Sequence, residues 1–344
     1  MKEKTFFVTG GLGFIGAHFV HYLHQHEFGA KIVVLDKITY AANLDRMADL
    51  VTQGSVILEE VDIADEKKIN TLFQKHQPHV VLNFAAESHV DNSIAGPAVF
   101  LETNVKGTFT LLVAARRLWM EESNSLKEEF KTACFYQIST DEVFGSLEKE
   151  GKFNELSNYA PNSPYSASKA AADHWVRSYH HTYGLPTVLS YCSNNFGPHQ
   201  HSEKLLPTIV RNALDGRPIP IYGNGENVRD WLFVEDHCAA ITLILEKGKR
   251  GETYAIGGNN EYSNIDLCRK LLSLLDTISP RKDGGTYNSQ IDFVTDRLGH
   301  DYRYAIDATK IKTELGWEPK VSFEKALELT LRHYLEVYLK DNKA

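Results

Sequence analysis

The sequence predicts a doubly wound, mostly parallel α/β sheet followed by a smaller mixed α/β domain near the C-terminus. Two observations carry this prediction. Short apolar strands alternate with helical stretches over residues 5–190, an order typical of a parallel sheet with helices on both faces. The first strand also enters its helix through a glycine-rich turn, which is typical of sheets that bind a phosphate at a helix N-terminus.

The glycine turn indicates which ligand the sheet holds. Strand Thr5–Thr9 leads into GGLGFIG at 10–16, and a second strand at 31–35 ends at Asp36, twenty positions after the last glycine. Glycines let a pyrophosphate approach the backbone, and a carboxylate at that distance binds the adenosine ribose and repels a 2′-phosphate. We therefore expect a Rossmann-type domain that binds NAD rather than NADP, although Lys37 can weaken that preference.

The following elements continue the alternation. Strands are expected at 56–58, 80–84, 135–139 and 187–190, with helices at 67–76, 100–120 and 163–183. Polar segments at 84–88, 139–142 and 190–194 follow three of these strands. Since ligands bind at the carboxyl ends of parallel strands, we expect these segments to converge on one crevice. The expected division is 1–189 with 227–257 as the NAD-binding domain, and 190–226 with 258–344 as the second domain.

Composition agrees with an ordinary globular enzyme. The chain has 344 residues, 42% of them hydrophobic and 24% charged, with a formal net charge of −8, which argues against a surface that binds nucleic acid. No signal peptide or long apolar span is evident, and no C-x-x-C pair occurs. We expect a cytoplasmic protein, away from membranes, with four reduced cysteines: Cys134, Cys192, Cys238 and Cys268.

Tyr165 and Lys169 form a candidate redox pair. They stand four residues apart after Ser163 and Pro164, which are typical residues for the N-cap and first position of a helix, so both side chains project from one helical face. A lysine ammonium and a nicotinamide cation would lower the tyrosine pKa and make it a general base. An ordinary helix with an exposed lysine is the alternative for this spacing taken alone.

Thr140-Asp141-Glu142 precedes that helix and places two adjacent carboxylates after a strand. A solvated acidic turn is the alternative, but the glycine turn and the tyrosine-lysine helix favour catalysis. A reaction that only oxidised and reduced a sugar would not need both acids. By contrast, His199 and His201 have no third ligand cluster beside them, so they are expected to be loop residues and no metal is predicted.

Nearly the whole chain resembles the extended short-chain dehydrogenase/reductases, and within them it is similar to the dTDP-glucose 4,6-dehydratases. Nucleotide-sugar epimerases of this superfamily usually carry serine in place of Thr140 and lack the acidic pair. The motifs that carry the resemblance are GGLGFIG, LDKITYA, NFAAESHVD, NVKGT, STDEVFG, SPYSASKAAADH, CSNNFGPHQHSEKL, PIPIYGNGENVRDWLFVEDH and DRLGHDYRYAID.

The resemblance implies an NAD-dependent lyase that converts dTDP-glucose to dTDP-4-keto-6-deoxyglucose and water. Tyr165 would take the 4-hydroxyl proton as hydride leaves C4 for NAD⁺, with Lys169 and Thr140 holding the tyrosine and the hydroxyl. Glu142 would remove the C5 proton, and a protonated Asp141 would protonate the leaving C6 hydroxyl. Hydride would then return to C6, so that NAD is restored and stays bound.

The resemblance also implies two sets of binding residues. Those expected to bind the cofactor are Gly10, Gly13, Phe14, Ile15, Gly16, Asp36, Lys37, Thr39, Asp62, Ile63, Phe84, Ala85, Ala86, Ser88, Thr103, Tyr165, Lys169 and Asn195. Those expected to bind the nucleotide sugar are Ser88, Thr140, Asn194, Lys204, Leu205, Pro220, Ile221, Tyr222, Arg229, Asn264, Arg297 and His300. The segment 220–222 would lie against the base, and arginines suit the diphosphate.

Several alternatives stay open at this point. Asn92 and Phe144 replace an arginine and a tyrosine usual in the family, so a UDP-sugar or another hexose is a possible substrate. A 4-epimerase or a decarboxylase of the same fold is disfavoured by the acidic pair, and a non-catalytic NAD-sensing protein by the presence of Tyr165 and Lys169. By analogy, helices 100–120 and 163–183 would pair with a second subunit as a four-helix bundle in a homodimer.

Overall fold

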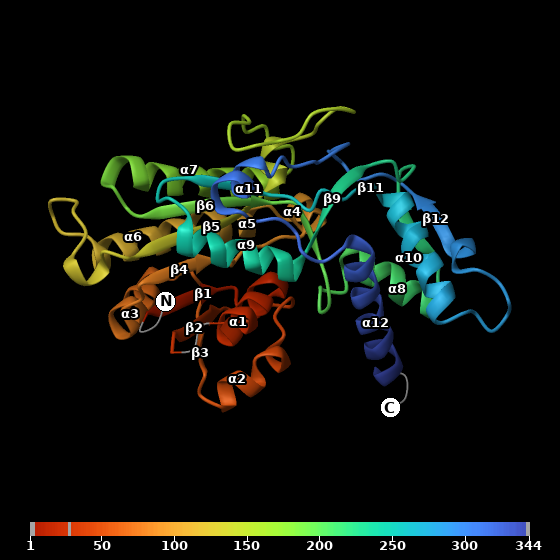
Figure 1. The fold of residues 1–344 in the computed structure, drawn as a ribbon, viewed down its shortest axis with the longest axis horizontal. Helices are drawn as coiled ribbons and strands as arrows, with labels where there is room; N and C mark the ends of the chain where they lie inside the picture. The colour runs from red at the N-terminus through yellow and green to blue at the C-terminus, as the bar shows by residue number, and fades with distance from the viewer. Residues whose placement is uncertain (1–3, 27–28, 342–344) are drawn as a thin grey trace.

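Figure 1 shows a computed structural model of the chain, which describes residues 4–26 and 29–341. A large lobe holds a twisted sheet between helices, and a smaller lobe lies beside it (Figure 1). The predicted Rossmann-type sheet is confirmed. Its seven strands are all parallel, in the order β3 (Val56–Glu60), β2 (Lys31–Asp36), β1 (Thr5–Thr9), β4 (Val80–Asn83), β5 (Cys134–Thr140), β6 (Thr187–Cys192) and β10 (Thr253–Ile256).

Helices cover both faces of this sheet. One face packs against α1 (Phe14–His26), α9 (Val234–Lys247) and α11 (Thr309–Leu315). The other packs against α3 (Glu66–His76), α6 (Thr108–Trp119) and α7 (Pro164–Tyr183). Successive residues of β1 therefore belong to different cores and are all buried. Burial on both faces explains why the strands read as continuous apolar runs rather than as alternating patterns.

The helix that carries the tyrosine-lysine pair begins where the sequence predicts. The Ser163 side chain accepts a hydrogen bond from Ser166 N, the Ser166 side chain accepts one from Ser163 N, and Pro164 occupies the first turn. This capping box satisfies donors that a helix N-terminus leaves unpaired. Gly184, with a φ of +72°, ends the helix in the left-handed conformation. Both termini of α7 are thus encoded locally.

The predicted helix at 100–120 is present with one irregularity. It comprises α5 (Ala98–Phe100), a π-helical segment Leu101–Gly107, and α6. Gly107 lies against the Ile63 side chain, where a Cβ atom would come within 2.5 Å of Ile63 Cδ1. The stretch Ala98–Trp119 is long and apolar enough to cross a membrane by length and composition alone. More than half of it is buried in the fold, as in the core helix of a globular protein.

The smaller lobe has its own core. Helices α8 (Leu205–Leu214), α10 (Asn264–Ile278) and α12 (Phe323–Asp341) pack there around aliphatic and aromatic side chains. Two small sheets complete it: β7 (Asn194–Phe196), β9 (Val228–Phe233) and β11 (Glu261–Ser263) form one, and β8 (Ile219–Tyr222) pairs with β12 (Ile291–Val294) in the other. Figure 1 shows these helices on the right, with α12 descending toward the C-terminus.

Two segments depart from the expected domain division. Strand β9 was assigned to the NAD-binding domain, but it pairs with β7 and β11. Its Trp231 and Phe233 lie in the core of the smaller lobe, whereas Leu232 between them faces the core of the large lobe. Helix α11 was assigned to the second domain, yet Ile311 packs in the large lobe. Strand β9 contributes to both cores because its alternate side chains point to opposite sides. Helix α11 follows the smaller lobe in the chain but packs against the large one.

The glycine turn permits a specific stability test. A Cβ atom at Gly16 would lie 2.3 Å from the Gly10 carbonyl oxygen, whereas one at Gly96 would meet nothing closer than 3.9 Å. We expect Gly16→Ala to cost about 1–3 kcal/mol of unfolding free energy, because backbone must move to admit the methyl group. Gly96→Ala should change it by less than about 0.5 kcal/mol. Calorimetric melting of both variants checks this, and equal melting temperatures would contradict it.

Candidate active site

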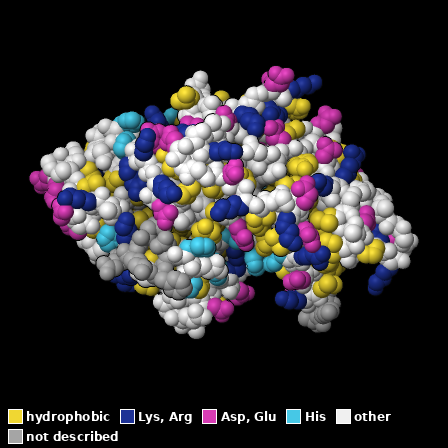
Figure 2. Space-filling view, in the orientation of Figure 1, with side chains coloured by type: hydrophobic (Ala, Val, Ile, Leu, Met, Phe, Trp, Pro, Cys, Tyr) yellow, Lys and Arg dark blue, Asp and Glu magenta, His cyan; other side chains and the backbone are white. Residues whose placement is uncertain are grey.

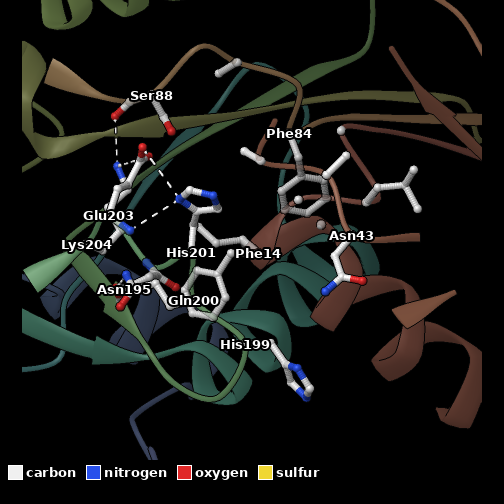
Figure 3. Close-up of a pocket in the computed structure, with 18 of the residues that line it drawn as sticks. Phe14, Asn43, Phe84, Ser88, Asn195, His199, Gln200, His201, Glu203 and Lys204 are labelled. Carbon is white, nitrogen blue, oxygen red and sulfur yellow. Dashed lines mark hydrogen bonds and ion pairs between the residues drawn. The ribbon is translucent and has the colours of Figure 1, made fainter. Parts of the chain in front are cut away.

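The polar segments predicted to converge do line one cavity of about 780 Å³ at the carboxyl edge of the sheet. Its wall includes residues from 84–88, 139–142 and 192–195, together with the glycine turn. Figure 3 shows one part of this wall, where Phe14 and Phe84 lie opposite Lys204 and Asn195. All eighteen residues expected to bind the cofactor line the cavity. The strand order also reverses beside β1, which is where such sheets bind ligands.

The glycine turn is shaped to admit a ligand against its backbone. Gly10 has a φ of +64°, and a Cβ atom on it would approach Ala85 Cα to 2.7 Å. Asp36 closes the turn from the next strand: its carboxylate accepts hydrogen bonds from Leu12 N at 3.0 Å and Ile38 N at 2.9 Å. These bonds oppose the rise in the Asp36 pKa that burial causes. The turn and the acid together fit a dinucleotide such as NAD.

Lys37 is less able to favour NADP than its position in the sequence suggests. Its Nζ atom lies 3.4 Å from Asp62 Oδ2 and 3.9 Å from Glu87 Oε1. It also donates a hydrogen bond to the Thr103 hydroxyl at 3.5 Å. The ammonium is therefore compensated inside the cavity wall, and it is less available to a 2′-phosphate.

Tyr165 and Lys169 project from α7 into the same cavity and are both buried. The lysine Nζ donates a hydrogen bond to the Ile138 carbonyl oxygen at 2.7 Å. Burial, followed by the Glu142 carboxylate, raises the tyrosine pKa well above its ordinary value, while a hydrogen bond with Thr140 opposes this. Without a bound cofactor the Tyr165 pKa is therefore raised, and the lowering expected from the lysine together with a nicotinamide cation stays a prediction.

The two adjacent acids occupy different environments. Asp141 is buried, and its Oδ1 accepts a 3.3 Å hydrogen bond from Thr140 while its Oδ2 has no partner within the described residues. Burial, then the carboxylates of Glu142 and Asp230, raise the Asp141 pKa well above its ordinary value. Asp141 is thus favoured in its protonated form.

Glu142 is partly exposed to the cavity. Burial raises its pKa as well, but the cations Arg229, Lys204 and Arg297 oppose that rise. A protonated acid and a more readily ionised one therefore stand side by side, which is the arrangement that acid–base chemistry on one substrate requires.

Comparisons with known proteins follow this geometry. The sequence profile of the GDP-mannose 4,6 dehydratase family matches residues 7–330. A dTDP-glucose 4,6-dehydratase of Xanthomonas campestris is 53% identical over 331 residues, which are 96% of this chain and 93% of the relative. This chain belongs to the GDP-mannose 4,6 dehydratase family.

Solved structures agree with that membership. A dTDP-glucose 4,6-dehydratase from Streptomyces venezuelae, crystallised with NAD, superposes with a TM-score of 0.86 at 42% identity, covering 96% of this chain and 97% of that one. A UDP-glucose 4-epimerase from Thermotoga maritima, crystallised with UDP-glucose, has a TM-score of 0.84 at 28% identity, covering 97% and 99%. Enzymes of both activities share the fold.

In this family member, four of the twelve residues expected to bind the sugar nucleotide line the cavity: Ser88, Thr140, Asn194 and Lys204. Lys204 reaches across the crevice, since its Nζ donates to the Ser88 carbonyl oxygen at 3.2 Å and lies 3.8 Å from Glu203. Figure 3 shows Ser88, Glu203 and Lys204 together at one end of the cavity wall. Asn194 Oδ1 is buried without a hydrogen-bond partner among the described residues.

The other expected contacts lie beyond that wall. Arg229 is buried, donates to the carbonyl oxygens of Val228 at 2.8 Å and Asp301 at 3.0 Å, and lies over the Tyr304 ring. It acts on the two acids through its charge. Leu205 and Asn264 begin α8 and α10.

A third group gathers near the edge formed by β8 and β12. Arg297 forms two hydrogen bonds with Asp91, at 2.6 and 2.9 Å, and lies 5.2 Å from the centre of the exposed Tyr222 ring. The His300 ring lies edge to face with the same ring, with 6.3 Å between the ring centres. Pro220 is exposed, but Ile221 is buried in the core of the smaller lobe. The Ile221 side chain therefore faces away from any nucleotide base, because alternate residues of a strand point to opposite sides.

Sequence reasoning missed one wall of the cavity. Helix α12 supplies His333, Tyr334, Val337 and Asp341, which lie about 130 residues or more beyond the loop at 199–204 that it faces. The rings of His199 and His333 lie 4.0 Å apart. In Figure 2, histidine side chains gather in the middle of the visible face, where the lobes meet. No local motif signals such a contact, since it depends on how the lobes dock. Within the described residues, no cluster of His, Cys, Asp or Glu could hold a metal ion.

The two departures from the family pattern have simple environments. Phe144 is buried in an aromatic cluster, where its ring lies 4.6 Å from that of Tyr191 and 5.1 Å from that of Phe153. A hydroxyl group there would need its own hydrogen-bond partner. Asn92 donates a 3.3 Å hydrogen bond to the Tyr40 hydroxyl at an exposed position.

The surroundings of Lys37 predict the effect of removing its partner. In Asp62→Asn the Lys37 ammonium loses its nearest carboxylate, so the affinity for NADP should rise relative to the affinity for NAD. Because the pair is partly exposed and such pairs are worth up to about 1 kcal/mol, we expect the ratio of the two dissociation constants to shift by about two- to five-fold. Titration of cofactor-free protein with each dinucleotide measures it. Glu66→Gln, which removes the same charge beside Arg117 instead, should leave the ratio unchanged; an equal shift there would contradict the prediction.

Proposed function

We propose that this chain is an NAD-dependent dTDP-glucose 4,6-dehydratase, a hydro-lyase. The observation that carries the proposal is the adjacent pair Asp141 and Glu142, whose environments favour different protonation states beside Tyr165 in a cavity that fits a dinucleotide. Relatives that align over more than nine-tenths of the chain bear the same name, including those from Xanthomonas campestris and Shigella flexneri.

Each catalytic residue has a role that its position supports. Tyr165 accepts the proton of the sugar 4-hydroxyl, with the Thr140 hydroxyl beside it. Once C4 is a ketone, the C5 proton becomes acidic, and Glu142 removes it. Asp141 donates its proton to the hydroxyl that leaves C6 as water. When bound, NAD supplies the hydride acceptor at C4 and the hydride donor at C6, so the overall reaction consumes no cofactor.

Binding of the substrate falls to the smaller lobe in this proposal. Lys204, Arg229 and Arg297 converge electrostatically on Glu142, and a diphosphate would be attracted by the same cations. We assign the exposed Tyr222, whose ring contacts both Arg297 and His300, to the base of the nucleotide. A thymine differs from a uracil by one methyl group, which a pocket distinguishes by about 1–3 kcal/mol. A UDP-sugar therefore remains the main alternative substrate.

Mass spectrometry tests the substrate and the reaction together. Purified protein is incubated separately with dTDP-glucose and UDP-glucose, without added NAD. We expect a product lighter by one water from the thymidine compound, because a cofactor that is regenerated need not dissociate. Water loss from the uridine compound alone would show that the substrate is a UDP-sugar, while the proposed reaction would stand. An isobaric product from either, with NAD also supplied, would favour a 4-epimerase like the Thermotoga maritima neighbour.

Glu142→Gln separates the elimination from the first oxidation. The amide cannot remove the C5 proton, so water loss should fall by about 100-fold or more. Proton transfer to Tyr165 should continue, which would leave reduced cofactor detectable by its absorbance. Full turnover to the dehydrated sugar would refute the assigned role. Glu148→Gln, an acid six residues further along an exposed loop, is the matched control and should behave as the unaltered protein.

We further propose a cytoplasmic homodimer built on helices α5 to α7. Apolar side chains are exposed there, including Leu101 at 61% and Trp175 at 42%. The Phe109 and Trp175 rings pack edge to face at 5.0 Å, which joins the two helices into one apolar surface. Exposed apolar patches of this kind are typical of interfaces. The four cysteines are free and buried, as suits a reducing compartment.

The dimer proposal predicts a selective effect of charge. Phe109→Glu places a carboxylate in the proposed interface and should give a monomer, because an unpaired charge is costly to bury. Phe293→Glu, at a more exposed phenylalanine on β12, should leave the dimer intact. Size-exclusion chromatography with light scattering measures both. A monomeric unaltered protein, or equal behaviour of the two variants, would refute the interface.

A further inference from the structure

A buried carboxylate lies one helical turn beyond Lys169. Asp173 has no exposed surface and projects from the same face of α7 as the lysine. Its Oδ2 accepts hydrogen bonds from the Ser139 hydroxyl at 2.5 Å and the Tyr159 hydroxyl at 3.3 Å. Its Oδ1 has no hydrogen-bond partner among the described residues. Burying a carboxylate with an unpaired oxygen is costly, so packing alone would favour an apolar residue here.

The bonds of Asp173 and Lys169 reach consecutive residues of one strand. Lys169 donates to the Ile138 carbonyl oxygen, and Asp173 accepts from the side chain of Ser139. Thr140 and the two catalytic acids follow directly along the chain. Helix α7 therefore holds the end of β5 at two adjacent points. This double contact sets the position of the acidic pair relative to Tyr165, which projects from the first turn of the same helix.

The charge of Asp173 also acts on the lysine. Burial lowers the Lys169 pKa, and the Asp173 carboxylate is the largest influence opposing this. Conversely, burial raises the Asp173 pKa to about 7, against the opposing effects of Lys169 and the Ser139 and Tyr159 hydroxyls. Asp173 is therefore neutral below that pH and ionised above it. Loss of its charge would lower the lysine pKa and weaken its hold on the proton.

Other charged groups near this carboxylate act on the two tyrosines, Tyr159 and Tyr191, that are hydrogen-bonded in its surroundings. The Tyr159 hydroxyl is hydrogen-bonded to that of Tyr191 on β6, and Arg177 and Glu155 act with opposite sign on Tyr191. The His174 ring contacts the Tyr159 ring from the exposed side of α7. Among the described residues, Lys169 is thus the cation that lowers the pKa of Asp173 itself.

We propose that Asp173 is a positioning residue for the redox step: it holds Ser139 at the end of β5 and keeps Lys169 protonated beside Tyr165. This role rests on the dehydratase function proposed above. It adds a third member behind the tyrosine-lysine pair, and it links the geometry of the two acids to the protonation of the lysine.

Asp173→Asn tests the role, because the amide keeps the shape and removes the charge. We expect the folded variant to lose about 10- to 100-fold in kcat, since small misplacements of reacting groups carry costs of this size, with KM for the nucleotide sugar within about three-fold. In the unaltered enzyme, kcat should fall on the acid side as Asp173 takes up a proton near pH 7. The variant should lose this acid limb, and its alkaline limb should move to lower pH as Lys169 deprotonates more readily.

Ser139→Ala is the second variant, and it removes the hydrogen bond while leaving the charge. We expect a smaller fall in kcat, about three- to ten-fold. The acid limb should move to higher pH, because the Ser139 hydroxyl no longer lowers the Asp173 pKa, while the alkaline limb should stay in place. Ser289→Ala, remote on an exposed turn, should match the unaltered enzyme. A folded Asp173→Asn variant with unchanged kcat and limbs would overturn the proposal. If the Asp173→Asn variant does not fold, a Ser139→Ala variant with unchanged kcat would overturn the proposal instead.

The unaltered enzyme separates this proposal from the one on which it rests. If it releases no water from a nucleotide sugar, the dehydratase function and the role of Asp173 both fail. If it releases water while Asp173→Asn does so equally well across the pH range, only the role of Asp173 fails.

Discussion

The carboxyl end of β5 carries ionisable groups into a space from which the sheet has already excluded water. All seven residues of this strand are buried, and Thr140 leads directly into Asp141 and Glu142. A charge in such a place must be paired or neutralised. Lys169 meets this requirement through the Ile138 carbonyl oxygen, and Arg229 through carbonyl oxygens of the smaller lobe. The arrangement of the active site follows from how each of these groups is compensated.

The cost of an uncompensated buried charge also gives two neighbouring carboxyl groups different protonation preferences. Asp141 points into the protein, where the nearest strong influences after burial are other carboxylates. Glu142 opens to the cavity, where three cations from the smaller lobe face it. Residues of nearly identical chemistry, adjacent in the chain, thereby differ in which form they favour. Elimination of water needs both forms at once, so the docking of the smaller lobe is part of the catalytic apparatus as well as of substrate binding.

The fold itself does not decide the reaction. An epimerase at 28% identity superposes with a TM-score of 0.84, close to the 0.86 of a dehydratase at 42%. What the two have in common is a sheet that presents ligands at its carboxyl edge. Function must therefore be argued from the site, which in this chain holds a pair of acids at one strand end.

Local chemistry in the sequence determined much of this protein. The capping box at Ser163 and the glycine turn before α1 depend on neighbours a few residues away, and both form where the sequence predicts them. Parallel strands also oblige polar segments at their ends to share one edge, which is why the crevice could be anticipated without any long-range information.

Tertiary structure decided what depends on distant packing. It placed β9 between two cores, buried Ile221, and brought α12 to the cavity wall. It also buried Tyr165, and this burial raises the Tyr165 pKa in the absence of a cofactor. Desolvation is a property of everything that surrounds a group, and most of those surroundings lie far away in the chain. The sequence by itself therefore determined which groups take part and at which strand end, whereas only the docking of the two lobes decided their protonation and the surface they offer to a ligand.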